Sequence, residues 1–185
     1  RGFFYELSKK KNVVMAGDIG CYALGGAEPL NAKDMCICMG AAPSIGHGAQ
    51  KIFDKFHENM RVISTIGDST FFHTGINSIM NIAYNRSKTI TVILDNRITG
   101  MTGHQDHPGT GYTLQGMPTK ALAIEGVVKA LGIDQVRTVN PLNLRQVRDA
   151  LDWALALDEP SVIITRWPCV LKKQSPQDKE EFGSY

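Results

Sequence analysis

The residues best suited to chemistry in this chain are an aspartate and an asparagine that each follow an apolar run. Asp68 comes after the run at 62–66 and a glycine, and Asn96 follows the run at 90–94 and one further aspartate. Carboxylate and amide oxygens form a hard ligand set, which suits Mg²⁺ or Ca²⁺ rather than zinc. Mg²⁺ usually takes one or two carboxylates from a protein and completes its shell with water and phosphate oxygens. The pair therefore predicts a metal ion that in turn holds a diphosphate.

The residues after Asp68 are compatible with this site and with a simpler alternative. Ser69 and Thr70 are small, so N–H groups at the start of a following helix would be open to an anion. A Gly-Asp-Ser sequence is also typical of an ordinary helix N-cap, because Asp and Ser satisfy free N–H groups. The spacing favours the ligand site: Asn96 lies 28 positions beyond Asp68, about the length of a strand, a crossover helix and a parallel neighbour. We expect the two strand ends to lie side by side.

Short apolar runs alternate with helical patterns along the whole chain, and the runs predict strands. The runs are 13–16, 35–39, 62–66, 90–94, 136–139 and 162–165. Because they show little polar alternation, we expect an α/β fold with three layers, a mostly parallel sheet with helices on both faces. Ligands of such sheets bind beyond the carboxyl ends of the strands. The segments expected there are 17–26, 40–48, 67–74 and 95–116.

The helical patterns have recognisable boundaries in two places. One helix is expected from about Pro118 to Gly132, with proline at its start and glycine past its end. Another begins at Asn143, where Gln146 three residues later forms a variant of the capping box. It is expected to bury Leu144, Val147, Leu151, Ala154 and Leu155. Apolar residues at helical spacing also mark 52–60 and 76–83.

Composition limits the classes of function. The chain has 185 residues, 43% of them hydrophobic, and a net charge of +2. This charge gives no reason to expect nucleic acid or a membrane surface as a partner, and no apolar run approaches the ~20 residues that span a bilayer. With no recognisable signal peptide, a cytoplasmic location is expected. Residues 1–171 form one expected domain, and the charged segment 172–185 has no aliphatic residue, which predicts a linker or a disordered tail.

The four cysteines form no Cys-x-x-Cys pair, so neither a disulfide framework nor a zinc or iron–sulfur site is predicted. Cys36 and Cys38 lie in the apolar run 35–39, where strand alternation would direct both to one face. We expect both to be buried as small hydrophobes.

Four segments together resemble a known family. Gly67-Asp68-Ser69 followed by Asp95-Asn96 resembles the Gly-Asp-Gly…Asn-Asn motif of thiamine diphosphate enzymes, with Ser and Asp in place of Gly and the first Asn. ITGMTGHQ (98–105), GDIGCYALG (17–25) and MGAAPSIGHG (39–48) resemble segments of 2-oxoacid:ferredoxin oxidoreductases, and in particular of the large subunit of indolepyruvate:ferredoxin oxidoreductases. The resemblance covers about residues 1–171.

The resemblance implies thiamine diphosphate and Mg²⁺ as cofactors, and it implies which residues hold them. The metal ligands would be Asp68, Asn96 and the backbone carbonyl of Ile98. The cofactor-binding residues would be Gly20, Cys21, Gly67, Asp68, Ser69, Thr70, Asn96, Ile98, Thr99, Gly100 and Met101. The catalytic candidates are Cys21 and His47.

Each remaining candidate has a plain alternative. Cys21 is expected near the cofactor ring, or else simply buried. His47 lies in a predicted loop, where it could approach the cofactor or substrate as a general acid or base. His104 and His107 share one loop and are either close to the substrate or solvated. His73 is expected to cap or pack a helix, and His57 to lie on an exposed helix face.

The activity that the resemblance implies is oxidative decarboxylation of a 2-oxoacid, with indolepyruvate as the expected substrate, to an acyl-coenzyme A with electrons passing to ferredoxin. In this family the activating Glu lies on a separate pyrimidine-binding domain, and the iron–sulfur clusters need Cys-x-x-Cys runs that this chain lacks. We therefore expect one domain of a larger subunit, working with a pyrimidine-binding domain and a small subunit and forming a dimer. The alternatives are a subunit of a non-oxidative thiamine diphosphate-dependent decarboxylase, and a non-catalytic binding module that keeps the fold.

Overall fold

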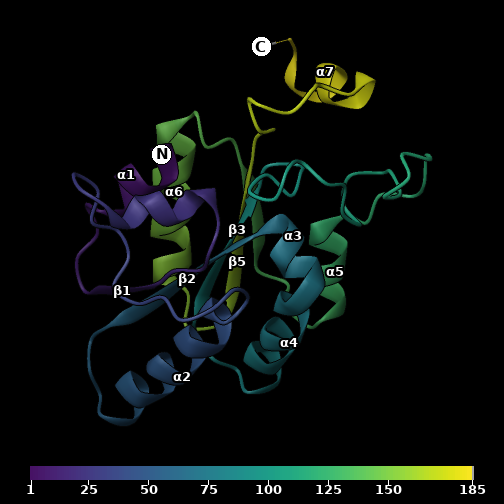
Figure 1. The fold of residues 1–185 in the computed structure, drawn as a ribbon. Helices are drawn as coiled ribbons and strands as arrows, with labels where there is room; N and C mark the ends of the chain where they lie inside the picture. The colour runs from purple at the N-terminus through teal and green to yellow at the C-terminus, as the bar shows by residue number, and fades with distance from the viewer. Residues whose placement is uncertain (185) are drawn as a thin grey trace.

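A single parallel sheet organises the protein (Figure 1). The computed structural model describes residues 1–184, and its strands lie in the order β1–β2–β3–β5–β4. They are β1 (Val13–Ala16), β2 (Arg61–Gly67), β3 (Ile90–Asp95), β4 (Val136–Val139) and β5 (Ser161–Arg166). Every neighbouring pair is parallel. The central strands are almost entirely buried, as their apolar sequences predict for a sheet that is covered on both faces.

Helices cover the two faces of this sheet and complete the three layers. On one face α1 (Gly2–Leu7) and α6 (Leu144–Ala156) pack against each other and against strand residues that include Ile63. On the other face lie α2 (Ala42–Lys55), in a cluster with Val62, and α4 (Ile76–Tyr84) and α5 (Ile124–Ala130), in a cluster with Ile66. Successive strand side chains point to opposite faces, which is why one strand supplies both cores. The expected three-layer α/β fold is confirmed.

Short helical pieces complete the chain at the carboxyl ends of the strands. They are the 3₁₀ helix η1 (Cys21–Gly26), the first turn α3 (Asp68–Thr70), the π-helical turn η2 (Phe71–Gly75) and the terminal helix α7 (Pro176–Phe182). Because α3, η2 and α4 follow one another without a break, a helical segment begins directly at Asp68.

The predicted strand at 35–39 is wrong. This segment makes only an isolated bridge, between Met35 and Ala16. Ala16 is the last residue of the four-residue strand β1, so the residues after Met35 have no strand to pair with. The chain then turns away, and Gly40 adopts a positive φ of 87°. Cys36 and Cys38 are consequently exposed, contrary to the expected burial.

The helix boundaries agree with the sequence where local capping sets them. The side chain of Asn143 accepts the N–H of Gln146 at 3.1 Å and begins α6 as predicted. Of the expected buried residues, Val147, Leu151 and Ala154 are buried and Leu155 is partly buried, whereas Leu144 is 37% exposed. The helix expected from Pro118 begins only at Ile124, because Pro118 pairs with Tyr112 in a bridge. The helix ends before Gly132 as predicted, and Gly132 itself has a positive φ of 96°.

The segment 172–185, expected as a linker or a disordered tail, contains helix α7. The side chain of Ser175 accepts the N–H of Asp178, and Asp178 accepts from the backbone N–H of Ser175, which together form a capping box. Lys172 also forms an ion pair with Asp178 at 2.8 Å. Local capping thus accompanies a helix over Pro176–Phe182 in a segment that has no aliphatic residue.

Candidate functional site

A cleft of about 100 Å³ opens at the carboxyl ends of β1, β2 and β3. The loop after β1, the start of α3 and the turn after β3 form its walls. Every residue that the sequence predicts to bind the cofactor lines this cleft: Gly20, Cys21, Gly67, Asp68, Ser69, Thr70, Asn96, Ile98, Thr99, Gly100 and Met101. The fold thus brings together segments that are about 80 residues apart in the chain.

The register of the sheet explains why the two polar strand ends meet. Gly67 of β2 pairs with Leu94 of β3, so the residues that follow, Asp68 and Asp95, lie at the ends of adjacent parallel strands. The expected neighbourhood of the two strand ends is confirmed. Asp68 is the first residue of a helical segment, so its carboxylate lies where backbone N–H groups point toward an anion.

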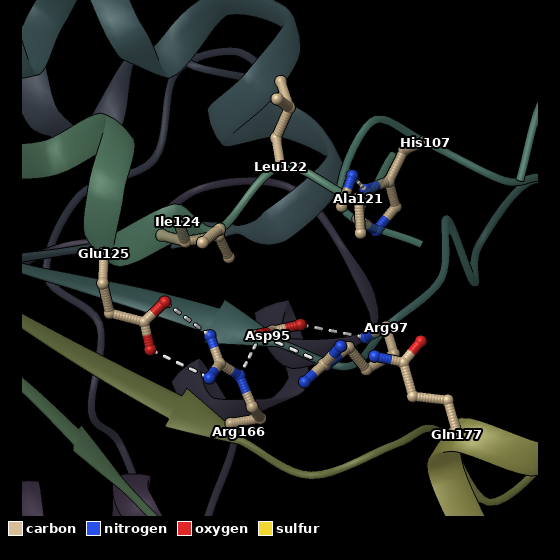
Figure 2. Close-up of a pocket in the computed structure, with 11 residues that line it drawn as sticks. Asp95, Arg97, His107, Ala121, Leu122, Ile124, Glu125, Arg166 and Gln177 are labelled. Carbon is tan, nitrogen blue, oxygen red and sulfur yellow. Dashed lines mark hydrogen bonds and ion pairs between the residues drawn. The ribbon is translucent and has the colours of Figure 1, made fainter. Parts of the chain in front are cut away.

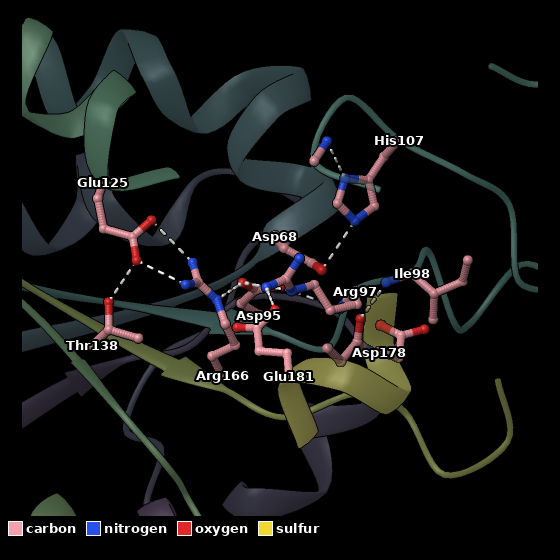
Figure 3. A network of polar contacts seen from close by, with 12 residues as sticks. Asp68, Asp95, Arg97, Ile98, His107, Glu125, Thr138, Arg166, Asp178 and Glu181 are labelled. Carbon is pink, nitrogen blue, oxygen red and sulfur yellow. Dashed lines mark hydrogen bonds and ion pairs between the residues drawn. The ribbon is translucent and has the colours of Figure 1, made fainter. Parts of the chain in front are cut away.

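Asp68 is buried, and its oxygens have only neutral partners among the described residues (Figure 3). Oδ1 accepts the N–H of Ser69 at 2.9 Å, and Oδ2 lies 3.0 Å from Nε2 of His107. The N–H of Gly109 donates to Nδ1 of His107 at 3.1 Å, so Nδ1 is the acceptor and Nε2 carries the proton. The histidine is therefore neutral and donates to Asp68. No lysine or arginine pairs with Asp68 in the described part of the chain, although buried carboxylates normally need a cation.

The turn after β3 presents two further oxygens. Oδ1 of Asn96 accepts the N–H of Ile98 at 3.1 Å and keeps a second lone pair for another partner. The backbone carbonyl of Ile98, a residue only 4% exposed, accepts no hydrogen bond from the described residues. Together with Asp68 they make an oxygen-only set with one carboxylate, which is the donor chemistry of Mg²⁺ beside a phosphate.

Asp95 has a different role from Asn96. Its carboxylate accepts from Nε of Arg166 at 2.6 Å, and Arg97 lies 3.6 Å away (Figure 2). Burial and the nearby charge of Asp68 raise the pKa of Asp95, while Arg166 acts in the opposite direction. Asp95 lines a neighbouring pocket of about 270 Å³ between β3, β5 and α5. Its carboxylate is thus paired with Arg166 and Arg97 in that pocket.

Arg166 joins this carboxylate to helix α5. Its guanidinium also contacts Glu125 at 2.8 and 3.0 Å. Burial alone would raise the pKa of Glu125, but hydrogen bonds from Arg166 and Thr138 lower it to about 2. The two acids in turn raise the pKa of Arg166, against the effect of its burial. Glu125 and Arg166 thus form a charged brace beside the cleft.

Three further contacts shape the wall of the cleft. The hydroxyl of Thr99 donates to the hydroxyl of Ser69 at 2.8 Å, which joins the two sides. A Cβ built on Gly100 would lie 3.6 Å from Nδ2 of Asn96 and 4.0 Å from Sγ of Cys21, so these three residues meet. Cys21 is exposed at the start of η1, so the alternative of simple burial is wrong.

His47 does not lie where the sequence predicts it. It belongs to the second turn of α2 rather than to a loop, because that helix begins at Ala42. It does not line the cleft. Its Nδ1 is buried without a hydrogen-bond partner among the described residues, and burial lowers its pKa. The geometry gives no support for an acid or base role on a ligand of this cleft.

The other histidines divide clearly. His107 is buried against Asp68, so the expected solvation is wrong for it, and its ring lines a pocket of about 580 Å³ together with Ser69 and Thr99. His104 is exposed in the same loop. His73 is exposed on η2, and His57 is exposed just beyond α2.

Sequence reasoning missed Tyr22 as a residue of the site, and it named His107 without its contact to Asp68. The hydroxyl of Tyr22 accepts the N–H of Gly67 at 3.0 Å and donates to the carbonyl of Ile19 at 3.2 Å, which ties the loop after β1 to the end of β2. Burial, with the nearby charge of Asp18, raises the pKa of Tyr22. Nothing in the local sequence marks Tyr22. For His107, the only signal is its place in a loop that follows Asn96.

Residues 1–184 contain neither a cluster of metal-binding side chains nor a membrane-spanning helix. No group of three or more His, Cys, Asp or Glu side chains could hold a metal ion there, so a site built from such side chains alone is not formed. No helix in the same range is long and apolar enough to cross a membrane.

The sequence matches the family model described as thiamine pyrophosphate enzyme, C-terminal TPP binding domain, over residues 9–165. Curated relatives are named indolepyruvate oxidoreductase subunit IorA. The protein of Archaeoglobus fulgidus is 44% identical over 160 residues, which are 86% of this chain and 25% of the relative. That of Thermococcus kodakarensis is 39% identical over 184 residues, 94% of this chain and 28% of the relative. The chain thus spans about a quarter of the length of these relatives.

Solved structures show the same fold at low sequence identity. A 2-oxoglutarate:ferredoxin oxidoreductase from Magnetococcus marinus superposes with a TM-score of 0.80 at 16% identity, over 97% of this chain and 67% of that chain. A benzoylformate decarboxylase from Polynucleobacter necessarius gives 0.63 at 15% identity, over 89% of this chain and 32% of that chain. Because the family model spans most of the sequence, this chain belongs to the thiamine pyrophosphate enzymes, as a C-terminal TPP-binding domain.

Proposed function

We propose that this chain is the thiamine diphosphate- and Mg²⁺-binding domain of an indolepyruvate:ferredoxin oxidoreductase. The observation that carries the proposal is Asp68, a buried carboxylate without a cationic partner in the described residues, in a cleft lined by the expected cofactor residues. The names of relatives that are 37–44% identical to this chain support the enzyme class.

The residues present fit a diphosphate-bound Mg²⁺. Asp68 would supply the carboxylate, Asn96 its amide oxygen and Ile98 its free backbone carbonyl. Water and the diphosphate oxygens would complete the shell. The start of the helical segment at Asp68 would add N–H groups and the positive end of a helix dipole on the phosphate side.

When it is bound, thiamine diphosphate supplies the carbanion stabilisation that decarboxylation of a 2-oxoacid requires. The residues of this chain would position it. His107 holds Oδ2 of Asp68 in place, and the Ser69–Thr99 hydrogen bond holds the two sides of the cleft together. Gly20 and Cys21 would face the ring of the cofactor, since they lie on the loop after β1. Cys21 is exposed and would be this chain's candidate for contact with the reacting atoms.

The rest of the enzyme would supply what this chain does not carry. We place the activating Glu on a pyrimidine-binding domain, the iron–sulfur clusters outside this chain, and a small subunit beside it, with the assembly a dimer. The substrates would be a 2-oxoacid, coenzyme A and ferredoxin. A cytoplasmic location is consistent with four free cysteines in the described residues, since reducing compartments keep thiols free.

Calorimetric titration of the 185-residue chain with thiamine diphosphate and Mg²⁺ tests the proposal. The wild-type chain should bind the diphosphate only when Mg²⁺ is present. Asp68→Ala should abolish this binding and leave the circular dichroism spectrum unchanged, because it removes the only carboxylate of the ligand set. Asp134→Ala is the matched control, as Asp134 is exposed and does not line the cleft. Equal affinity in Asp68→Ala and Asp134→Ala would contradict the metal assignment.

A further inference from the structure

The turn that carries two of the proposed metal ligands contains a residue in an unfavourable conformation. Arg97 lies between Asn96 and Ile98 and has a φ of +61°, in the left-handed region that residues with a Cβ rarely adopt. Backbone hydrogen bonds hold the turn from within: the N–H of Arg97 donates to Oδ1 of Asp95 and that of Ile98 to Oδ1 of Asn96. A strained residue persists only where its surroundings hold it.

The surroundings of Arg97 come from helix α7, more than 80 residues further along the chain (Figure 3). Nη2 of Arg97 donates to Oε2 of Glu181 at 2.7 Å, and the guanidinium carbon lies 5.7 Å from the centre of the Phe182 ring. On its other side Nε lies 3.6 Å from Oδ2 of Asp95. The Arg97 side chain is 16% exposed and that of Glu181 is 39% exposed, so the ion pair is partly open to water.

Helix α7 is itself attached to the end of the sheet. The ring of Phe182 packs edge to face on Trp167, which directly follows β5, with centroids 5.5 Å apart. The capping box of Ser175 and Asp178, with the ion pair from Lys172, fixes the start of the helix. Glu181 and Phe182 are therefore held relative to the strand ends.

We propose that α7 is a clamp for the metal-binding turn, in which Glu181 and Phe182 hold Arg97 so that Asn96 and Ile98 present their oxygens to the metal. Arg97 is then a positioning residue and contacts neither metal nor phosphate. The inference rests on the proposed function, because it concerns the same metal ion. If the Arg97–Glu181 pair had a purely structural role, its loss would lower the free energy of unfolding and leave the affinity for the cofactor unchanged. That change in stability would be small, because partly exposed ion pairs stabilise little.

The first test compares two neighbouring glutamates. Glu181→Gln should lower the affinity for Mg²⁺–thiamine diphosphate about 10-fold by calorimetry, the size of effect that residues behind metal ligands commonly have. Glu180→Gln should leave it unchanged, because Glu180 is exposed on the same helix and makes no side-chain contact among the described residues. Thermal unfolding of both variants checks that the fold is kept. Equal affinities in the two variants would overturn the clamp.

The second test uses the strained conformation. Arg97→Ala loses the clamp and keeps the unfavourable φ, whereas Arg97→Gly loses the clamp but adopts a positive φ freely. We expect the glycine variant to bind Mg²⁺–thiamine diphosphate more tightly than the alanine variant. If Arg97 instead binds phosphate directly, both variants are equally weak and the inference fails.

The two proposals fail in distinguishable ways. A wild-type chain that does not bind Mg²⁺–thiamine diphosphate overturns the proposed function, and the clamp with it. A wild-type chain that binds, with Asp68→Ala inactive in binding and Glu181→Gln as tight as Glu180→Gln, overturns the clamp alone.

Discussion

At the scale of single residues, the pair of Asp68 and His107 is the least expected feature. Both side chains are nearly inaccessible to solvent, with exposures of 3% and 4%. A carboxylate that is buried against a neutral histidine has no cationic partner among the described residues, and buried charges are normally paired or bound to a metal. The hydrogen bond from His107 orients the carboxylate, as groups bonded to metal ligands commonly do.

Two substitutions of His107 test this orientation. His107→Leu should weaken Mg²⁺-dependent binding of thiamine diphosphate about 10-fold, because Oδ2 of Asp68 loses its donor. It should also destabilise the fold by about 2 kcal/mol, the cost of an unsatisfied buried acceptor. His107→Gln, which keeps an N–H donor at similar reach, should recover most of both losses.

Calorimetry and urea unfolding measure the two effects. His104→Leu is the control, since His104 is exposed in the same loop. If His107→Leu binds as tightly as His104→Leu, the histidine does not position Asp68.

At the scale of elements, Arg166 connects three of them around the cleft. It ends β5, pairs with Asp95 at the end of β3 and pairs with Glu125 in the first turn of α5. Helix α5 has only seven residues, so this contact supplements its apolar packing through Ile124 and Val128. The strand ends that carry the cleft are thereby held against one face helix.

The brace has a predictable pH dependence. The pKa of Glu125 in the folded protein is about 2, below its ordinary value of 4.5. Its stabilising contribution is therefore present above pH 4.5 and is lost as the pH falls toward 2. Glu125→Gln should lower the free energy of unfolding by about 1 kcal/mol at pH 6, a modest value because the Glu125 side chain is about a third exposed to solvent.

Urea unfolding at pH 6 and pH 3 measures this. The difference between wild type and Glu125→Gln should be smaller at pH 3, and Glu58→Gln, at an exposed site without a side-chain partner in the described residues, should show none. A difference that grows toward pH 3 would contradict the assignment.

At the scale of the whole molecule, the cleft is about 100 Å³, below the roughly 300–1,000 Å³ of typical small-molecule sites. Under the proposed function it is an open half-site, in which the metal and the start of the helical segment would hold the diphosphate end. This agrees with a site that closes only against a second domain.

We therefore expect the 185-residue chain to be catalytically silent. Indolepyruvate, coenzyme A and a viologen acceptor should give no reduction of the acceptor, because the sequence has no Cys-x-x-Cys run to carry electrons. Binding of a cofactor alone does not replace groups that act in the transition state. Acceptor reduction followed by absorbance measures this, with a complete indolepyruvate oxidoreductase as the positive control. Reduction above the blank by the chain alone would show that the catalytic groups have been misplaced.

The sequence by itself determined the features that depend on short stretches of chain. Apolar runs without polar alternation predicted the parallel sheet, and the 28-residue interval between Asp68 and Asn96 predicted adjacent strand ends, since one crossover unit spans that length. The cap at Asn143 and the helix end at Gly132 are equally local. Where a local pattern lacked a partner strand, as at 35–39, the prediction was wrong.

Only the tertiary structure decided which distant side chains complete the site. His107 reaches Asp68 across 39 residues, and Glu181 reaches Arg97 across 84. Such contacts depend on where a long loop and a terminal helix come to rest, which no local periodicity encodes. His47 is an example of a local pattern that misled. Its two flanking glycines predicted a loop, but His47 lies within α2. The proximity of the proposed ligands follows from strand order and spacing, and the contacts of His107 and Glu181 around them follow from long-range packing.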